Sequence, residues 1–209
     1  MPSGILSIHR RTYLLQLCSV KRQQQRNLNI YIMNNFSIPV KEQVTPANQA
    51  IFDNLTGMVG FVPNLFAIFA HSDTALSDYL SLQNRKSSIR AKEREVINLV
   101  VSQVNACSYC LSAHTQFAKM NGFSDAQILE IRRANISFDP KLDALAKLVK
   151  STVEHRGHAS PETLEQFYAA GYTEENLIDV TMIIGDKIIT NYLHALTSVP
   201  VDWPLAPAL

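Results

Sequence analysis

The chain has 209 residues, of which 46% are hydrophobic and 18% charged, and its formal net charge is +1. This composition is typical of a soluble globular protein with one well-packed domain, and the charge does not indicate binding to nucleic acid or to an anionic membrane. Three cysteines are too few, and odd in number, for a secreted disulfide scaffold, so we expect a reducing compartment, the cytoplasm.

Residues 1–32 differ from the rest of the chain because they contain five basic residues and no acidic one. Such a basic extension is typical of an organelle transit peptide or of a nucleic-acid-binding arm. Met33, however, opens a stretch that resembles a natural start, so an upstream start codon or an expression remnant is our preferred explanation. We therefore leave residues 1–32 out of the fold prediction and expect one helical domain over residues 33–209.

From residue 45 onward, the spacing of apolar residues and the capping residues predict helices only. We expect them over residues 74–87, 91–104, 107–121, from 124 onward, 139–157, 160–171 and 173–195. The expected N-caps are Ser124, Asp139, Ser160 and Thr173, with Pro140 and Pro161 at first helical positions and Gly122 and Gly171 as stops. Three prolines exclude a helix over residues 199–209. The predicted fold class is an all-α bundle of about six to eight helices.

Four residues with complementary chemistry lie within residues 95–114. Cys107 and Cys110 form a Cys-x-x-Cys pair at the start of a predicted central helix, and His114 follows four residues after Cys110. On a helix these spacings place both thiols and the imidazole on one face. Glu95 belongs to the preceding helix and reaches that face if the two helices form an antiparallel hairpin. The set predicts a redox-active dithiol with a Glu/His proton relay.

The pattern Glu-x11-Cys-x2-Cys-x3-His resembles the signature of the alkyl hydroperoxidase D (AhpD) group in the carboxymuconolactone decarboxylase superfamily. The resemblance is strongest over residues 94–124 and weaker over residues 45–205. It implies an oligomeric peroxidase without cofactor or metal, trimeric or hexameric, reduced by a lipoyl- or thioredoxin-like partner. It also implies that Cys110 attacks the hydroperoxide, that Cys107 resolves the sulfenic acid as a disulfide, and that Glu95 and His114 relay protons.

Two local features complicate these roles. The start of a helix, where Asn105 is expected to act as cap, favours Cys107 rather than Cys110 as the more acidic thiol. Tyr109 stands where the best-known AhpD proteins have a second histidine. It could donate a hydrogen bond to a peroxide or a thiolate, or pack against its neighbours.

Other functions fit parts of the pattern. One is a carboxymuconolactone decarboxylase-like lyase acting on a small carboxylic acid or lactone, which would not need the two cysteines. Another is a non-catalytic helical assembly module in which the cysteines sense redox state. A structural zinc site is disfavoured because Cys107, Cys110 and His114 supply only three of four ligands. The apolar runs over residues 96–104 and 178–189 also predict a homo-oligomer.

Overall fold

The computed structural model describes residues 36–209, so the basic extension, residues 1–32, lies outside the described residues. Residues 37–209 form one compact unit of helices without a strand, which confirms the all-α prediction. The elements are η1 (Lys41–Gln43), α2 (Pro46–Val59), α3 (Asn64–Phe69), α4 (Ala75–Gln83), α5 (Ala91–Val104), α6 (Ser108–Met120), α7 (Asp125–Arg133), α8 (Pro140–Glu154), α9 (Pro161–Ala169) and α10 (Glu174–Thr197). These nine α-helices exceed the expected six to eight because the sequence pattern did not resolve α2 and α3 individually.

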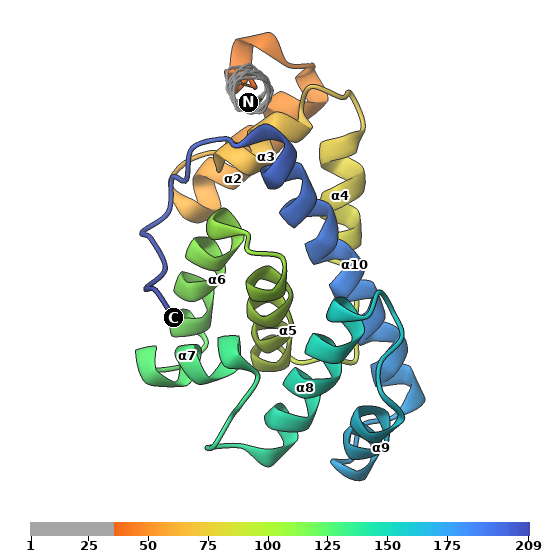
Figure 1. Cartoon of the computed structure of the whole chain (residues 1–209). Helices are drawn as coiled ribbons and strands as arrows, with labels where there is room; N and C mark the ends of the chain where they lie inside the picture. Colours follow the sequence, from red (N-terminus) through yellow and green to blue (C-terminus); the bar gives the residue numbers. More distant parts are fainter. Residues whose placement is uncertain (1–35) are drawn as a thin grey trace, which may run out of the picture. The chain divides into compact units, whose positions relative to one another are not determined.

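Helix α5 is the centre of the unit and packs against α6, α7, α8 and α10 (Figure 1). Eight consecutive residues of α5, residues 95–102, have almost no exposed surface, and Val96, Ile97 and Leu99 are fully buried. A helix that is apolar around most of its circumference must be surrounded by other elements. Burial of each such side chain contributes about 1.5–3 kcal/mol, so α5 is a rigid support for polar groups that it carries.

The predicted N-caps of α7 to α10 are confirmed. The side chains of Ser124, Asp139, Ser160 and Thr173 each accept a hydrogen bond from a backbone N–H of the following first turn. Caps of this kind each stabilise a helix by about 1 kcal/mol. Gly122 has a φ of +87°, a conformation that favours glycine, and it follows α6 where the stop was expected. Helix α4 is shorter than predicted and ends at Gln83.

The residues after α10 are not helical, as predicted, and they run past α3 and alongside α6 (Figure 1). Several hydrogen bonds fix this C-terminal segment to the helices. Asn64 Nδ2 donates to the Pro200 carbonyl at 3.1 Å, and the Ala206 N–H donates to Ser112 Oγ at 3.2 Å. Arg132 Nη1 donates to the Pro207 carbonyl at 2.6 Å. The segment is therefore held where its side chains can line a site between these helices.

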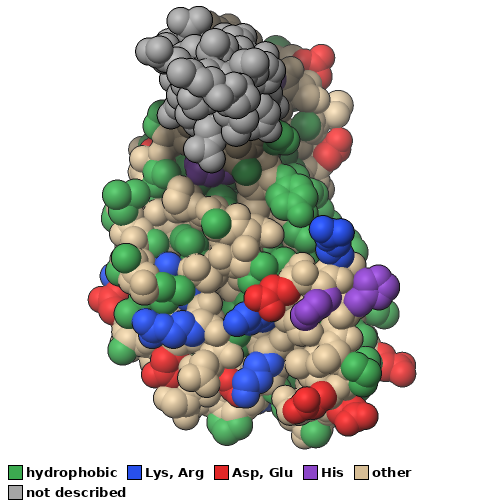
Figure 2. Space-filling view, viewed as in Figure 1, with side chains coloured by type: hydrophobic (Ala, Val, Ile, Leu, Met, Phe, Trp, Pro, Cys, Tyr) green, Lys and Arg blue, Asp and Glu red, His purple; other side chains and the backbone are tan. Residues whose placement is uncertain are grey.

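The surface carries charges of both signs. In the lower half of Figure 2, which shows helices α7 to α9, acidic and basic side chains lie interspersed, so this face has no broad patch of one sign. Within residues 36–209, no helix combines the length and the apolarity needed to cross a bilayer.

Candidate active site

A sharp turn between α5 and α6 positions the two cysteines. Ala106 has a φ of +52°, and the Cys107 N–H donates to the Ser102 carbonyl at 2.9 Å, so the chain reverses within a few residues. Cys107 is itself the N-cap of α6, and its Sγ accepts from the Cys110 N–H at 3.3 Å. The expectation that Asn105 caps α6 was wrong. Asn105 follows the last residue of α5, and its side-chain amide donates to Asn191 Oδ1 at 3.0 Å.

The two thiols are adjacent and buried. Cys107 Sγ and Cys110 Sγ lie 2.7 Å apart, and each cysteine is only 3% exposed. Both are free thiols in this structure. A disulfide between them requires only a small side-chain movement, because one helical turn already brings the sulfur atoms together.

The environment distinguishes the two thiols. Cys107 donates its S–H to Cys110, and this hydrogen bond lowers the pKa of Cys110 and raises the pKa of Cys107. Burial opposes ionisation of Cys110, whereas the nearby charge of Lys187 favours it. These effects favour Cys110 as the thiolate, although Cys107 occupies the helix start.

His114 and Glu95 form a buried pair across the α5–α6 hairpin. His114 Nδ1 lies 2.9 Å from Glu95 Oε2, and Asn98 Nδ2 donates to the other carboxylate oxygen at 3.2 Å. Burial, and then the charge of Lys187, lower the pKa of His114, while Glu95 acts in the opposite direction. A neutral imidazole that donates Nδ1–H to a carboxylate keeps a lone pair on Nε2, which makes it a general base.

Lys187 of α10 is a site residue that the sequence analysis missed. It is 3% exposed, and its Nζ lies 4.0 Å from Asp186 Oδ1. Burial lowers the pKa of Lys187, but Tyr79, Asp186, Cys110 and Glu95 together raise it above its ordinary value, so the side chain is a fixed cation. The sequence signal that could have identified Lys187 is the Asp186-Lys187 pair within an otherwise apolar run. Charged residues in such a run are expected to be buried, and buried charges are usually paired or functional.

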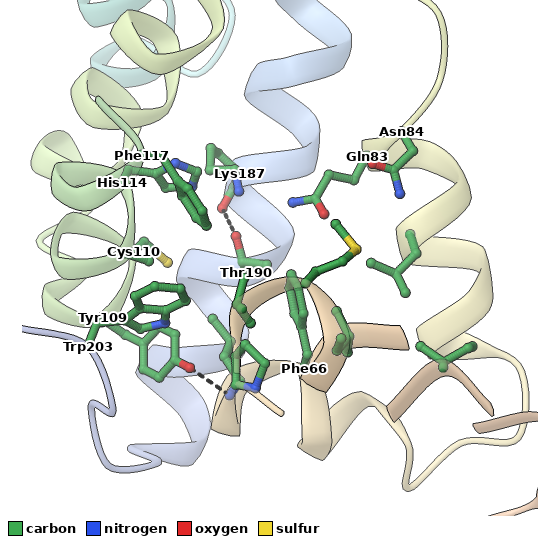
Figure 3. A pocket seen from close by; sticks show the side chains of 18 of the residues that line it. Phe66, Gln83, Asn84, Tyr109, Cys110, His114, Phe117, Lys187, Thr190 and Trp203 are labelled. Atoms are coloured by element: carbon green, nitrogen blue, oxygen red, sulfur yellow. Dashed lines mark hydrogen bonds between the residues drawn. The ribbon is translucent and has the colours of Figure 1, made fainter. Parts of the chain in front are cut away.

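A cavity of about 370 Å³ opens onto Cys110 (Figure 3). Cys110, His114, Lys187 and Thr190 supply its reactive and polar wall, whereas Cys107 does not line it. The remaining wall is mostly apolar and is formed by Ile51, Leu55, Met58, Val59, Pro63, Leu65, Phe66, Leu80, Tyr109, Ala113, Phe117 and Trp203, with Asn54, Gln83 and Asn84 at its edge. The cavity therefore suits a small, largely apolar molecule with one reactive polar group.

Trp203 and Tyr109 close one side of this cavity. The Trp203 ring packs edge-on against Phe117, with ring centroids 5.3 Å apart. The Tyr109 hydroxyl donates to Asp202 Oδ1 at 2.6 Å and accepts from the Leu65 N–H at 3.2 Å. Burial raises the pKa of Tyr109, so its hydroxyl stays protonated. The hydroxyl is thus engaged by the C-terminal segment and α3, and Tyr109 presents its ring to the cavity.

A second cavity of about 390 Å³, lined mostly by polar residues, adjoins the His114–Glu95 pair. Its lining includes Arg94, Asn98 and Asp186, together with Glu95 and His114. Asn98 Oδ1 and Asp186 Oδ1 are buried there without a hydrogen-bond partner in the protein. Such oxygens are suited to holding water, so the cavity can connect the carboxylate of Glu95 to solvent.

Of the other histidines that the structure describes, none lines the cavity beside Cys110. His155 and His158 are exposed near the end of α8. His194 Nε2 lies 3.2 Å from the Val199 carbonyl and its ring packs near Tyr109. Within residues 36–209, no cluster of three or more His, Cys, Asp or Glu side chains is arranged to hold a metal ion.

Residues 71–150 match the model of the carboxymuconolactone decarboxylase family. This segment contains Glu95, Cys107, Cys110 and His114. The fold is similar to the crystal structure of the alkylhydroperoxidase AhpD core, an uncharacterized peroxidase-related protein from Ralstonia eutropha JMP134, with a TM-score of 0.73 and 17% sequence identity over 80% of this chain and 92% of that one. Residues 71–150 are thus similar to the carboxymuconolactone decarboxylase family, and the fold is AhpD-like.

Two further proteins are similar to this AhpD-like chain. Uncharacterized protein YdfG of Bacillus subtilis (strain 168) is 28% identical over 103 residues, which are 48% of this chain and 70% of YdfG. The debrominase Bmp8, in complex with 2,3,4-tribromopyrrole, has a TM-score of 0.68 and 16% identity over 81% of this chain and 93% of its own. At these identities the structural similarities establish the fold.

Proposed function

We propose that this AhpD-like protein is a thiol-dependent peroxidase that reduces apolar organic hydroperoxides with the Cys110–Cys107 dithiol. The observation that carries the proposal is the position of Cys110, which faces an apolar cavity beside His114 and Lys187 and has Cys107 Sγ 2.7 Å behind it. Attack, proton transfer and resolution can then all occur within one buried site.

In the first step, the Cys110 thiolate attacks the terminal peroxide oxygen and the O–O bond breaks. Cys110 becomes a sulfenic acid, and the leaving alkoxide takes the proton that His114 had accepted from the thiol, giving an alcohol. Lys187 stabilises the negative charge, first on sulfur and then on the leaving oxygen. Glu95 holds the imidazole in the tautomer with Nε2 free and stabilises it while it carries the proton.

In the second step, the Cys107 sulfur attacks the sulfenic acid, a Cys107–Cys110 disulfide forms, and hydroxide leaves as water after gaining the Cys107 proton. The dithiol has then supplied two electrons and two protons for one hydroperoxide. A lipoyl- or thioredoxin-like dithiol reduces the disulfide by exchange and becomes a disulfide itself. Water in the polar cavity beside Glu95 equilibrates protons with solvent between cycles.

Reductive dehalogenation is a second candidate, favoured by the aromatic wall of the cavity, which includes Phe66, Phe117 and Trp203. The debrominase Bmp8 has the same fold. In this reaction, the dithiol becomes a disulfide while a carbon–bromine bond is replaced by carbon–hydrogen and bromide leaves. It requires the same two thiols but a halogenated aromatic compound instead of a peroxide.

The test is turnover by the full chain with dithiothreitol as reductant and with cumene hydroperoxide, hydrogen peroxide or tribromopyrrole as substrate. We expect cumene hydroperoxide to be consumed faster than hydrogen peroxide, and Cys110→Ser to abolish consumption. Cys18→Ser is the matched control and should retain full activity. Bromide release without peroxide consumption would favour dehalogenation, and a lyase activity that survives Cys107→Ser and Cys110→Ser would reject the dithiol mechanism.

A further inference from the structure

One side of α10 presents an uncharged apolar surface to solvent. Between residues 178 and 196, all of which the structure describes, every charged side chain of α10 faces the protein interior. The large apolar side chains on the opposite side are exposed by 40–72%. They are Ile178, Met182, Ile189, Tyr192 and Leu196, and Gly185 lies among them. We call these six residues the α10 stripe.

The spacing of the α10 stripe is that of a coiled-coil seam. Successive members are separated alternately by four and three residues, which keeps all six on one line along the helix. The line extends for about 27 Å at the helical rise per residue. Contiguous exposed apolar surfaces of several hundred Å² usually mark an interaction site in a soluble protein.

The α10 stripe is also complementary to a second copy of itself. Its spacing is the same in both chain directions, so two copies can pack antiparallel about a twofold axis level with Lys187. Ile178 then lies opposite the partner's Leu196, and Met182 opposite the partner's Tyr192. Gly185 lies opposite the partner's Ile189, and a Cβ built on Gly185 would have no neighbour within 4 Å. The smallest residue of the stripe thus leaves room for a branched side chain.

We propose that α10 is a homotypic interface at which two copies of this chain pack antiparallel along the α10 stripe. The antiparallel arrangement also opposes the two helix macrodipoles, which favours it over a parallel one. A twofold contact requires an even number of subunits. The same helix carries Lys187 on its inner face, so the interface supports the wall of the Cys110 cavity from behind.

The direction of packing is tested by disulfide cross-linking in a Cys18→Ser background. The double variant Ile178→Cys/Leu196→Cys should form a covalent dimer on oxidation, because position 178 of each copy lies opposite position 196 of the other copy. Each single variant should stay uncross-linked, since equivalent cysteines would lie about 27 Å apart. Cross-linking of the single variants would indicate parallel packing and overturn the proposal, as would absence of cross-linking in the double variant.

The energetic role of the stripe is tested by measuring the number of subunits of the full chain by sedimentation. Ile189→Glu places a charge at the centre of the interface in both copies and should raise the dissociation constant at least ~100-fold, which halves the number of subunits at micromolar concentration. Met120→Glu is the matched control on α6, where the native side chain is 80% exposed, and should leave the assembly unchanged. A monomeric or trimeric wild type, or an Ile189→Glu assembly of unchanged size with native helicity, would contradict the proposal.

Discussion

The imidazole of His114 and the carboxylate of Glu95 lie on different helices, nineteen residues apart in sequence, and their Nδ1 and Oε2 atoms are 2.9 Å apart. Both side chains are buried, and Asn98 holds the second carboxylate oxygen. The pair is positioned by the tight α5–α6 turn and by the rigid packing of α5. It therefore has the fixed orientation that a proton relay requires.

Loss of the Glu95 charge should weaken this relay. In Glu95→Gln the side-chain oxygen can still accept from Nδ1–H, but the imidazolium formed during proton transfer is no longer stabilised. We expect kcat/KM for cumene hydroperoxide to fall about 100-fold with little change in thermal stability. Glu165→Gln, an exposed change on α9, is the matched control and should behave as wild type. Equal activity of Glu95→Gln and wild type would exclude Glu95 from the relay.

Removal of the Lys187 charge should change the pH dependence of the reaction. The charge lowers the pKa of Cys110, so Lys187→Met should raise that pKa and reduce the thiolate fraction at neutral pH. We expect the rate of thiol oxidation at pH 7 to fall at least ~10-fold and to recover as the pH approaches 9. Lys187→Arg keeps the charge and should retain most of the rate at pH 7. A loss that is the same at every pH would indicate a purely structural role.

Acidification should destabilise the wild type through His114. Burial and then Lys187 hold the pKa of His114 below its ordinary value, so the unfolded chain binds a proton that the folded chain does not. The stability contribution of the neutral ring is therefore complete above about pH 6.5 and decreases as the pH falls towards the lower pKa of the folded state.

The His114→Asn variant isolates this contribution, because asparagine can still donate to Glu95 but does not titrate. Urea unfolding at pH 7.5 and 5.5 should show a larger loss of stability for the wild type than for the variant. His194 is present in both proteins and cancels in the comparison. The same pH dependence in both proteins would show that His114 is not held neutral.

The Tyr109 hydroxyl should stabilise the C-terminal segment. Tyr109→Phe removes its bonds to Asp202 and to the Leu65 N–H, and we expect a loss of about 1–3 kcal/mol in the free energy of unfolding. Trp203 is the only tryptophan of the chain, so its fluorescence should report a more exposed indole. Tyr168→Phe on α9 is the control and should change stability by less than about 0.5 kcal/mol. An unchanged free energy and spectrum for Tyr109→Phe would contradict this role.

Local sequence signals predicted most of the fold. The starts of α7 to α10 follow from N-cap residues and first-turn prolines, whose effect is confined to one helical turn. The hairpin geometry that joins Glu95 to His114 follows from helical spacing and a short connection. Asn105 was assigned wrongly because the positive φ of Ala106 moves the helix start to Cys107, and a short turn of this kind leaves little sequence signal.

The rest of the site could not be predicted because it comes from distant parts of the chain. Lys187, Thr190 and Trp203 reach the cavity, and Asp202 reaches the Tyr109 hydroxyl, only through packing of α10 and the C-terminal segment against α3 and α6. In sequence, Lys187 is a charged residue in an apolar helix and Trp203 belongs to a proline-rich tail. Their common role depends on tertiary contacts, which single-sequence periodicity does not encode.

The central claim is that Cys110 and Cys107 form one redox couple, and mass spectrometry of the reduced full chain after one equivalent of cumene hydroperoxide tests it most directly. We predict a single Cys107–Cys110 disulfide, with Cys18 unchanged, and a dimedone-reactive sulfenic acid on Cys110 in the Cys107→Ser variant. Two thiols that survive this treatment, or a sulfenic acid that forms on Cys107 in the Cys110→Ser variant at the wild-type rate, would contradict the account.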